Sequence, residues 1–543
     1  MKLDKKLLSD YHEEYHGYHN ALGLYDTMQF VLRLRPDVHK IIEKLPNRLV
    51  KSNELDFESF QAFSTYLHET VHWWQHIGST SGLLLSLSYP SQMHINDSLL
   101  EDFIKETGKI KSIEKYNRLY AKHYEPEKQT NEFHIINQIL NNYHDIEFFK
   151  HITINPKHVK TIIENGYFVS IGHSFHITYS TFISVLAASF DRDFSFLPNL
   201  DTWVDEFSKL NTNKINGYHP NSDIYLSPIG LKEIYEGQAR FIQMQYLYAA
   251  SGKKLTWDSF DELGMLSGVY IEAFNFFIKT LDEQKPESIK SPLVALFLLV
   301  CDISINPGDG FPFEIKDYEQ FINNTDPGIR FIRLCTIIKD KAPEVKYQIV
   351  DYSTSEYYNI CIKICTLMGI PTPMDISNEI VKWSKSFESL ILLMEEEKIF
   401  DFKNENFPIR LIFSRFIRFQ EDKLKNPAFF CWAGMHMTEK QYIVDANELF
   451  DEHQALYRDG IDADIYPSII PNKDEKLITK TMNEFYTWVT LYGLVKQWIM
   501  EDGDFKYDYL WLTSKFTQSE TREWAKSIFK QKYNCSPDEF ESI

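Results

Sequence analysis

The chain has 543 residues, of which 43% are hydrophobic and 25% charged, a composition typical of a folded protein and not of a disordered one. This length exceeds what one simple core usually organises, so two or three packed units are expected. The formal net charge of −20 would repel a phosphate backbone, and no stretch of the sequence gathers enough lysine and arginine to offset it. Nucleic acid is therefore excluded as the expected partner.

The cysteines and the apolar runs predict a soluble cytoplasmic protein without a membrane partner. The six cysteines are scattered through apolar stretches, as is typical of buried thiols in a reducing compartment. Cys361 and Cys365 have helix-face spacing and are interpreted as core thiols, not as a metal or redox pair. The N-terminus lacks the apolar stretch of a signal peptide, and the longest apolar run, residues 292–301, is about half of a membrane span.

Three segments carry the clearest secondary-structure signals. Residues 27–36 partly alternate and predict a strand. Residues 56–78 have apolar side chains at helical spacing, with Asp56 as the N-cap and Gly78 at the end. A second helix is predicted over 228–251, with Ser227 as its cap and Gly252 closing it.

Helix outweighs strand along the whole sequence, so we expect a mainly α protein of the α+β class with a small β-sheet. The segment 282–292 is polar, contains two prolines and separates two apolar blocks. It is the predicted boundary between a first domain, residues 1–285, and a helical C-terminal domain, residues 290–543.

The pattern H-E-x-x-H occurs twice, at residues 12–16 and 68–72. Two histidines four residues apart lie on one helix face and can bind one ion, and the intervening glutamate can take a proton from a water beside that ion. The first copy contains the charged Glu14, has no apolar stripe before it and is interpreted as a solvated polar segment. The second copy lies on a long apolar helix and is followed by Trp73 and Trp74, which favours a buried metal site.

His68 and His72 are thus the predicted metal ligands, with Glu69 as the general base; the alternative is a pair of hydrogen-bonded core histidines. His76 lies about 12 Å from His68 along a continuous helix, too far to bind the same ion. We interpret His76 as a residue that either supports a ligand or faces solvent.

A third ligand has to come from another segment. Glu236 lies on the otherwise apolar second helix and is flanked by Gly237 and Ala239. These small residues are expected to let this helix approach the histidine helix closely. Glu233 and Glu272 remain alternatives for the third ligand.

The stretches "HETVHWWQ" and "EGQA" resemble the gluzincin group of zinc metallopeptidases, the thermolysin-like proteins, over two helices that form a small part of the chain. The resemblance implies Zn²⁺ bound by His68, His72 and Glu236, Glu69 as the general base, and a metallopeptidase-like first domain. The small sheet of the fold is expected near the metal helix. One position departs from the thermolysin pattern, which has an Asp where this chain has Arg240. Either another residue orients the histidine, or Glu236 is not the ligand.

The expected function is that of a zinc-dependent hydrolase, a peptidase that acts on a peptide or protein substrate. The alternative is a non-enzymatic helical interaction protein with a structural zinc or a metal-free histidine pair. A third interpretation is a peptidase that a regulatory protein partner has to release. Hydrolysis of this kind usually needs a donor near the developing negative charge; the candidates are His173, His176, Tyr179, His219, Tyr225 and Tyr235.

Overall fold

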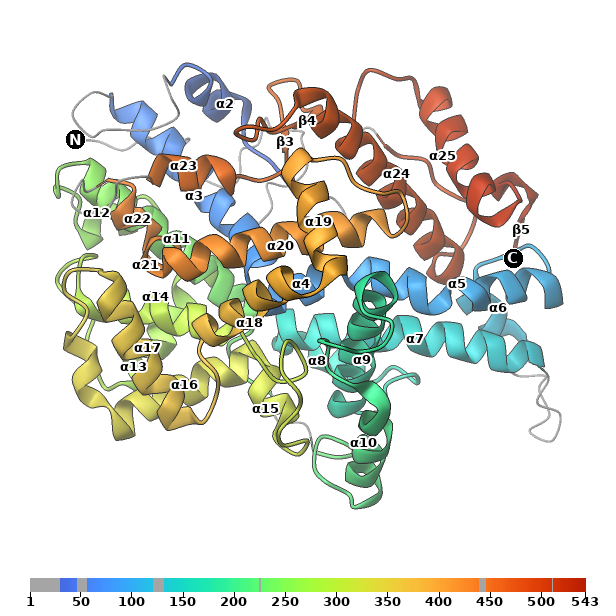
Figure 1. Cartoon of the computed structure of the whole chain (residues 1–543), viewed down its shortest axis with the longest axis horizontal. Helices are drawn as coiled ribbons and strands as arrows, with labels where there is room; N and C mark the ends of the chain where they lie inside the picture. The colour runs from blue at the N-terminus through green and yellow to red at the C-terminus, as the bar shows by residue number, and fades with distance from the viewer. Residues whose placement is uncertain (1–29, 46–55, 121–130, 224–225, 439–445, 510) are drawn as a thin grey trace.

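The predicted mainly helical fold is confirmed. The computed structural model describes residues 30–45, 56–120, 131–223, 226–438, 446–509 and 511–543 (Figure 1). Within these ranges helices dominate, and the strands form two small sheets. The first H-E-x-x-H copy, residues 12–16, and Tyr225 lie outside the described residues.

One small sheet lies against the helix that carries the second H-E-x-x-H copy. Strand β1 (Val31–Leu32) pairs in parallel with β3 (Tyr457–Asp459), which pairs antiparallel with β4 (Ile465–Pro467). Of the strand predicted over 27–36, residues 27–29 lie outside the described residues, and within the described part the strand covers Val31–Leu32. Phe30, directly before β1, packs its ring edge-on against Trp73 at 5.8 Å, which anchors the sheet on that helix. The other sheet pairs β2 (Ile110–Lys111) in parallel with β5 (Glu541–Ser542).

The histidine helix, α3 (Phe57–Gly78), begins as the sequence predicts. The carboxylate of Asp56 accepts a hydrogen bond from the backbone N–H of Ser59 at 2.8 Å, which satisfies one of the free donors at the helix start. Every residue from Ser59 to the end of the helix is buried. Gly78 ends α3 against the ring of Phe419, where a Cβ would come within 2.3 Å of a ring carbon. This helix is therefore a central element of the molecule.

The glutamate helix, α11 (Leu231–Ala250), packs along α3 but starts later than predicted. The hydroxyl of Ser227 accepts from the backbone N–H of Ile229 and does not cap the helix. Gly230 is the N-cap instead, and its backbone N–H donates to the carboxylate of Glu233 at 2.8 Å. The helix closes as predicted beside Gly252, which has a left-handed φ of 70°.

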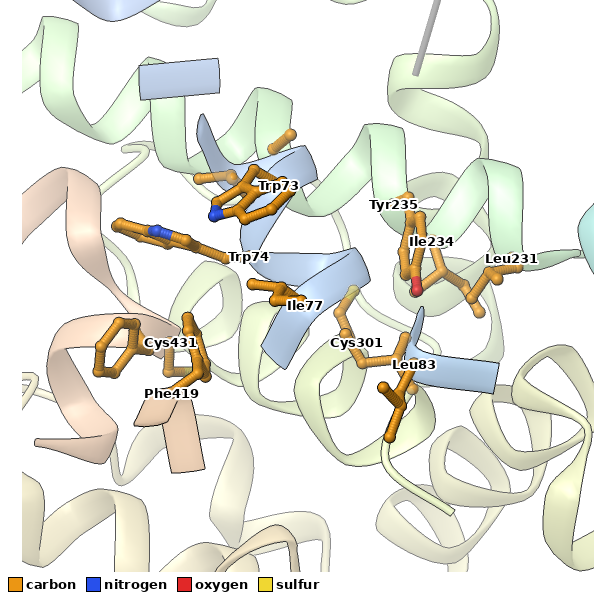
Figure 2. Close-up of a cluster of buried hydrophobic side chains, with 14 of the residues drawn as sticks. Trp73, Trp74, Ile77, Leu83, Leu231, Ile234, Tyr235, Cys301, Phe419 and Cys431 are labelled. Carbon is orange, nitrogen blue, oxygen red and sulfur yellow. The ribbon is translucent and has the colours of Figure 1, made fainter. Parts of the chain in front are cut away.

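A large apolar cluster surrounds the end of α3. It joins side chains of α3 and α11 to those of α14 (Pro292–Ser304), α20 (Phe407–Lys425) and α21 (Pro427–Cys431). Figure 2 shows this cluster with Trp73, Trp74, Ile77, Leu83, Leu231, Ile234, Tyr235, Cys301, Phe419 and Cys431 labelled.

The predicted domain boundary lies between α13 (Val269–Thr280) and α14. The rings of Phe274 and Phe277 on α13 contact that of Phe297 on α14, with centroids 5.2 and 5.6 Å apart. Helices on both sides of the boundary thus share one core cluster, and the division into 1–285 and 290–543 stays a prediction.

A second apolar cluster forms one end of the molecule, on the right in Figure 1. It brings helices from the early part of the chain against the last two long helices: α5 (Ser88–Glu106), α6 (Ile113–Tyr120), α7 (Asn131–Ile154), α24 (Glu475–Met500) and α25 (Gln518–Tyr533).

The remaining helical elements pack around these two clusters. In chain order they are α2 (Pro36–Ile42), α4 (Thr80–Ser86), η3 (Pro156–His158), α8 (Val159–Ile163), α9 (Ile171–Phe190), η4 (Leu200–Thr202), α10 (Trp203–Thr212), α12 (Trp257–Glu262), α15 (Phe321–Thr325), α16 (Pro327–Lys341), η5 (Pro343–Tyr347), α17 (Thr354–Met368), α18 (Pro373–Ser386), α19 (Glu388–Ile399), α22 (Ala433–His436), α23 (Ala446–Glu452) and η7 (Pro537–Glu539).

In the described part of the chain no single helix has the length and apolar character needed to cross a membrane; α17 and α18 reach them only as a pair, bent by 99°. The prediction of buried thiols is confirmed, because all six cysteines are buried and free. Cys361 and Cys365 place their sulfur atoms 4.0 Å apart inside the core.

Candidate metal site

Helices α3 and α11 bring the three predicted ligands together. The Nε2 atoms of His68 and His72 lie 3.2 Å apart, and the Oε2 atom of Glu236 lies 3.6 Å from the first and 3.4 Å from the second. In the described part of the chain this is the group of histidine, cysteine and carboxylate side chains that could hold a metal ion.

The distances within this group match those expected around a tetrahedral ion. Metal–ligand bonds of about 2.0–2.1 Å place neighbouring ligand atoms of a tetrahedron about 3.3–3.4 Å apart. The observed separations of 3.2, 3.4 and 3.6 Å are close to that edge length. Two imidazoles and one carboxylate would therefore occupy three corners and leave the fourth corner for another ligand.

The charges of the group also fit a cation. Both carboxylate oxygens of Glu236 are buried and accept no hydrogen bond from the described residues. Burial alone would raise the pKa of Glu236, but His72 and His68 hold it well below its usual range. Burial likewise opposes the protonation of His72, yet Glu236 raises the pKa of this histidine to about 9. Without an ion a protonated His72 balances the carboxylate, and a bound cation would take over that role.

Gln75 fixes the orientation of His72. Its side-chain nitrogen donates to the carbonyl of Tyr235 and to Oε1 of Gln238, both at 2.9 Å, so its oxygen is the atom that faces His72. That oxygen accepts from Nδ1 of His72 at 2.8 Å and leaves Nε2 directed at the group. The sequence left open which residue orients a ligand histidine, because Arg240 stands where the thermolysin pattern has an Asp. For His72 this residue is Gln75, one turn further along α3.

Glu69 lies beside the ligand group. It follows His68 on α3, has only 7% of its surface exposed, and its charge contributes to the raised pKa of His72. A buried carboxylate whose charge reaches a ligand histidine has the chemistry of a general base.

His76 is not part of the group and does not face solvent. It is buried with its ring 5.4 Å from that of Tyr235, and burial together with His72 lowers its pKa to about 3. A neutral ring is the expected state beside a cation site.

The two alternative carboxylates are engaged elsewhere. Lys157 forms ion pairs with both Glu233, at 2.9 Å, and Glu272. Since Glu233 also caps α11, neither carboxylate belongs to the ligand group. Of the three candidates the structure brings Glu236 to the histidines.

Gly237 was expected to let α11 approach α3 closely, and this prediction is wrong, because the glycine faces two other helices. A Cβ on this residue would lie 3.2 Å from the Phe297 ring of α14 and 3.6 Å from Ala273 of α13. Gly237 therefore permits the close approach of α13 and α14, not of α3.

Two residues that the sequence did not assign to the site lie next to it. Arg240, one turn after Glu236, is 2% exposed and places its guanidinium 3.9 Å from the ring centre of Tyr270 on α13. The Tyr270 ring lies 6.1 Å from that of His68, at 70° to it. Arg240 stood out only as a departure from the thermolysin pattern, and Tyr270 carried no signal because a contact between separate helices brings it here.

Most donors suggested for a developing negative charge have partners elsewhere. Tyr235 contacts a residue of the site, because its hydroxyl donates to the backbone carbonyl of Gln75 at 3.3 Å. The others pair as follows: His173 with Asp145, His176 stacked on Phe207, Tyr179 edge-on to Phe321, and His219 with the Pro220 carbonyl.

Comparison with known protein families, with curated proteins and with solved structures finds no match to this chain. The resemblance to gluzincins therefore stays an expectation from the two sequence motifs.

Proposed function

We propose that this protein is a zinc-dependent peptidase in which His68, His72 and Glu236 hold the metal. The observation that supports this proposal most is the near-tetrahedral spacing of three buried ligand atoms from two helices. Two histidines and one glutamate form a ligand set typical of catalytic zinc, which keeps one position open.

Zinc in such a site supplies a Lewis acid that activates a water molecule and polarises a carbonyl group. Glu69 would take the proton of the attacking water and pass it to the departing amine. Its low exposure keeps bulk water from competing for that proton. Gln75 would keep Nε2 of His72 directed at the metal throughout.

Replacement of the general base tests this function. The variant Glu69→Gln should retain its zinc and lose hydrolysis of a peptide library by about 10²- to 10⁴-fold, since the amide cannot accept the proton. The matched control is Glu58→Gln, an exposed glutamate in the first turn of the same helix, which should keep full activity. Hydrolysis by Glu69→Gln at the wild-type rate would show that this role of Glu69 is wrong.

One observation favours a second candidate, a non-enzymatic helical interaction protein with a metal-free pair. His72 and Glu236 already balance each other's charge at 3.4 Å without an ion. Elemental analysis separates the two functions: protein purified without chelators should contain zinc if it is the peptidase and none if the pair is only structural. A zinc ion closed off by four protein ligands would support a structural role.

A further inference from the structure

We infer that the first turn of α13 is the entrance to the metal site and that Tyr270 is the residue that substrate passes and contacts there. This inference rests on the proposed function. It names the side from which the site is reached, which neither motif predicts.

The burial of the site residues points to this side. His68, His72, Glu236 and Arg240 are all buried, and none has more than 2% of its surface exposed. Tyr270 contacts both Arg240 and His68, yet it is partly exposed. Tyr270 therefore lies between the ligand group and the surface of the protein.

The backbone before α13 turns at two glycines. Gly264 and Gly268 both have left-handed φ, 73° and 55°, and Gly268 combines this with a ψ of −138°, a conformation almost restricted to glycine. A Cβ added to either glycine would meet nothing within 4 Å. The short segment from Gly264 to Gly268 thus has glycines at both ends and open space beside them, directly before the helix turn that carries Tyr270.

Arg240 holds Tyr270 in place over the site. The guanidinium donates to the side chain of Gln243 at 2.6 Å, and Gln243 donates in turn to the hydroxyl of Ser64, one turn before His68 on α3. The ring of Tyr270 is therefore positioned by a chain of contacts that crosses α3 and α11. Arg240 acts here as a positioning residue through Tyr270.

Metal exchange tests the entrance without any need for catalysis. Zinc-loaded full-length protein would be mixed with a chromophoric chelator, and the rates of zinc release and of zinc rebinding would be recorded. Tyr270→Ala should raise both rates at least tenfold and leave the zinc Kd unchanged, because it opens the route but removes no ligand. Tyr270→Phe, which keeps the ring, should stay within twofold of wild type, and Arg240→Met should fall between the two.

The matched control is Phe276→Ala, which removes a partly buried ring from the same helix where it packs on Phe331, and its exchange rates should equal those of wild type. With a peptide substrate, Tyr270→Ala should raise KM more than it lowers kcat.

If Tyr270→Ala exchanges zinc at the wild-type rate, or only releases it faster with a matching loss of affinity, the entrance lies elsewhere and this inference is overturned while the proposed function stands. If the wild-type protein binds no zinc, both are overturned.

Discussion

At the scale of single residues, the candidate site combines a local pair with one distant partner. His68 and His72 meet because residues four apart share a helix face, so their spacing alone predicts the pair. Glu236 meets them through the packing of α11 on α3. Lys157 helps to decide among the carboxylates, because it engages Glu233 and Glu272 and leaves Glu236 facing the histidines.

Gln75 provides a test at this scale. Gln75→Leu should weaken zinc binding by about 10- to 100-fold, because His72 loses the acceptor that orients its ring. Zinc Kd would be measured by competition with a chelator of known affinity. Gln75→Glu restores an acceptor for Nδ1 and should bind zinc more tightly than the leucine variant. Equal affinity of wild type and Gln75→Leu would contradict an orienting role.

Local signals explain which parts of the site the sequence could predict. Asp56 caps α3 through a contact within the first turn of the helix, so the sequence alone could predict where this helix begins. Ser227 could cap a helix equally well, but a distant segment packs against the backbone next to it. A Cβ on Gly328 would lie 2.1 Å from the Ile229 carbonyl oxygen, and a contact of this kind cannot be read from the local sequence. Tyr270 likewise depends on how α13 packs, which no spacing within one helix reveals.

At the scale of elements, α11 is the helix on which the site is assembled. One face presents Glu236 to α3, and Gly237 lies against α13 and α14. The glycine therefore sets how closely the helix carrying Tyr270 can approach the site.

Gly237→Val should destabilise the protein by about 1–3 kcal/mol, because the added carbons overlap the Phe297 ring and force α13 and α14 outward. The matched control is Gly493→Ala, in the middle of α24 with nothing within 4 Å of the added Cβ. That control should stabilise by about 0.5–1 kcal/mol, since alanine favours helix over glycine. Urea unfolding measures both, and a Gly237→Val protein as stable as wild type would refute the close packing.

At the scale of the whole molecule, the aromatic side chains form a core that extends across many helices. The larger cluster runs from Phe30 to Val489 and includes both flanks of the predicted domain boundary. Charged and titratable groups buried with it make the stability of the fold depend on pH.

His436 of α22 illustrates this dependence. It is buried and donates from Nε2 to the Tyr352 carbonyl at 2.9 Å, and burial lowers its pKa to about 4 from 6.5. Above pH 6.5 it is neutral in both the folded and unfolded states. As pH falls from 6.5 to 4, His436 binds a proton in the unfolded chain but stays neutral in the folded protein. The free energy of unfolding therefore falls by about 1.4 kcal/mol per pH unit.

His436→Gln removes this term. Its free energy of unfolding should fall below that of wild type at pH 7.5, through the lost packing and hydrogen bond. The difference in free energy of unfolding between wild type and His436→Gln should be smaller by about 2–3 kcal/mol at pH 4.5. Urea unfolding at the two pH values measures the change, and a gap that does not depend on pH would show that His436 is not held neutral in the fold.

We propose that α3 and α11 together hold one metal ion. The most direct test is the zinc content of the full-length protein after zinc loading and dialysis into metal-free buffer. The wild type should retain one zinc per chain, His68→Ala/His72→Ala none, and His173→Ala/His176→Ala, a pair on α9 with other partners, one. A wild type without zinc, or a His68→Ala/His72→Ala protein that still retains one ion, would contradict the account.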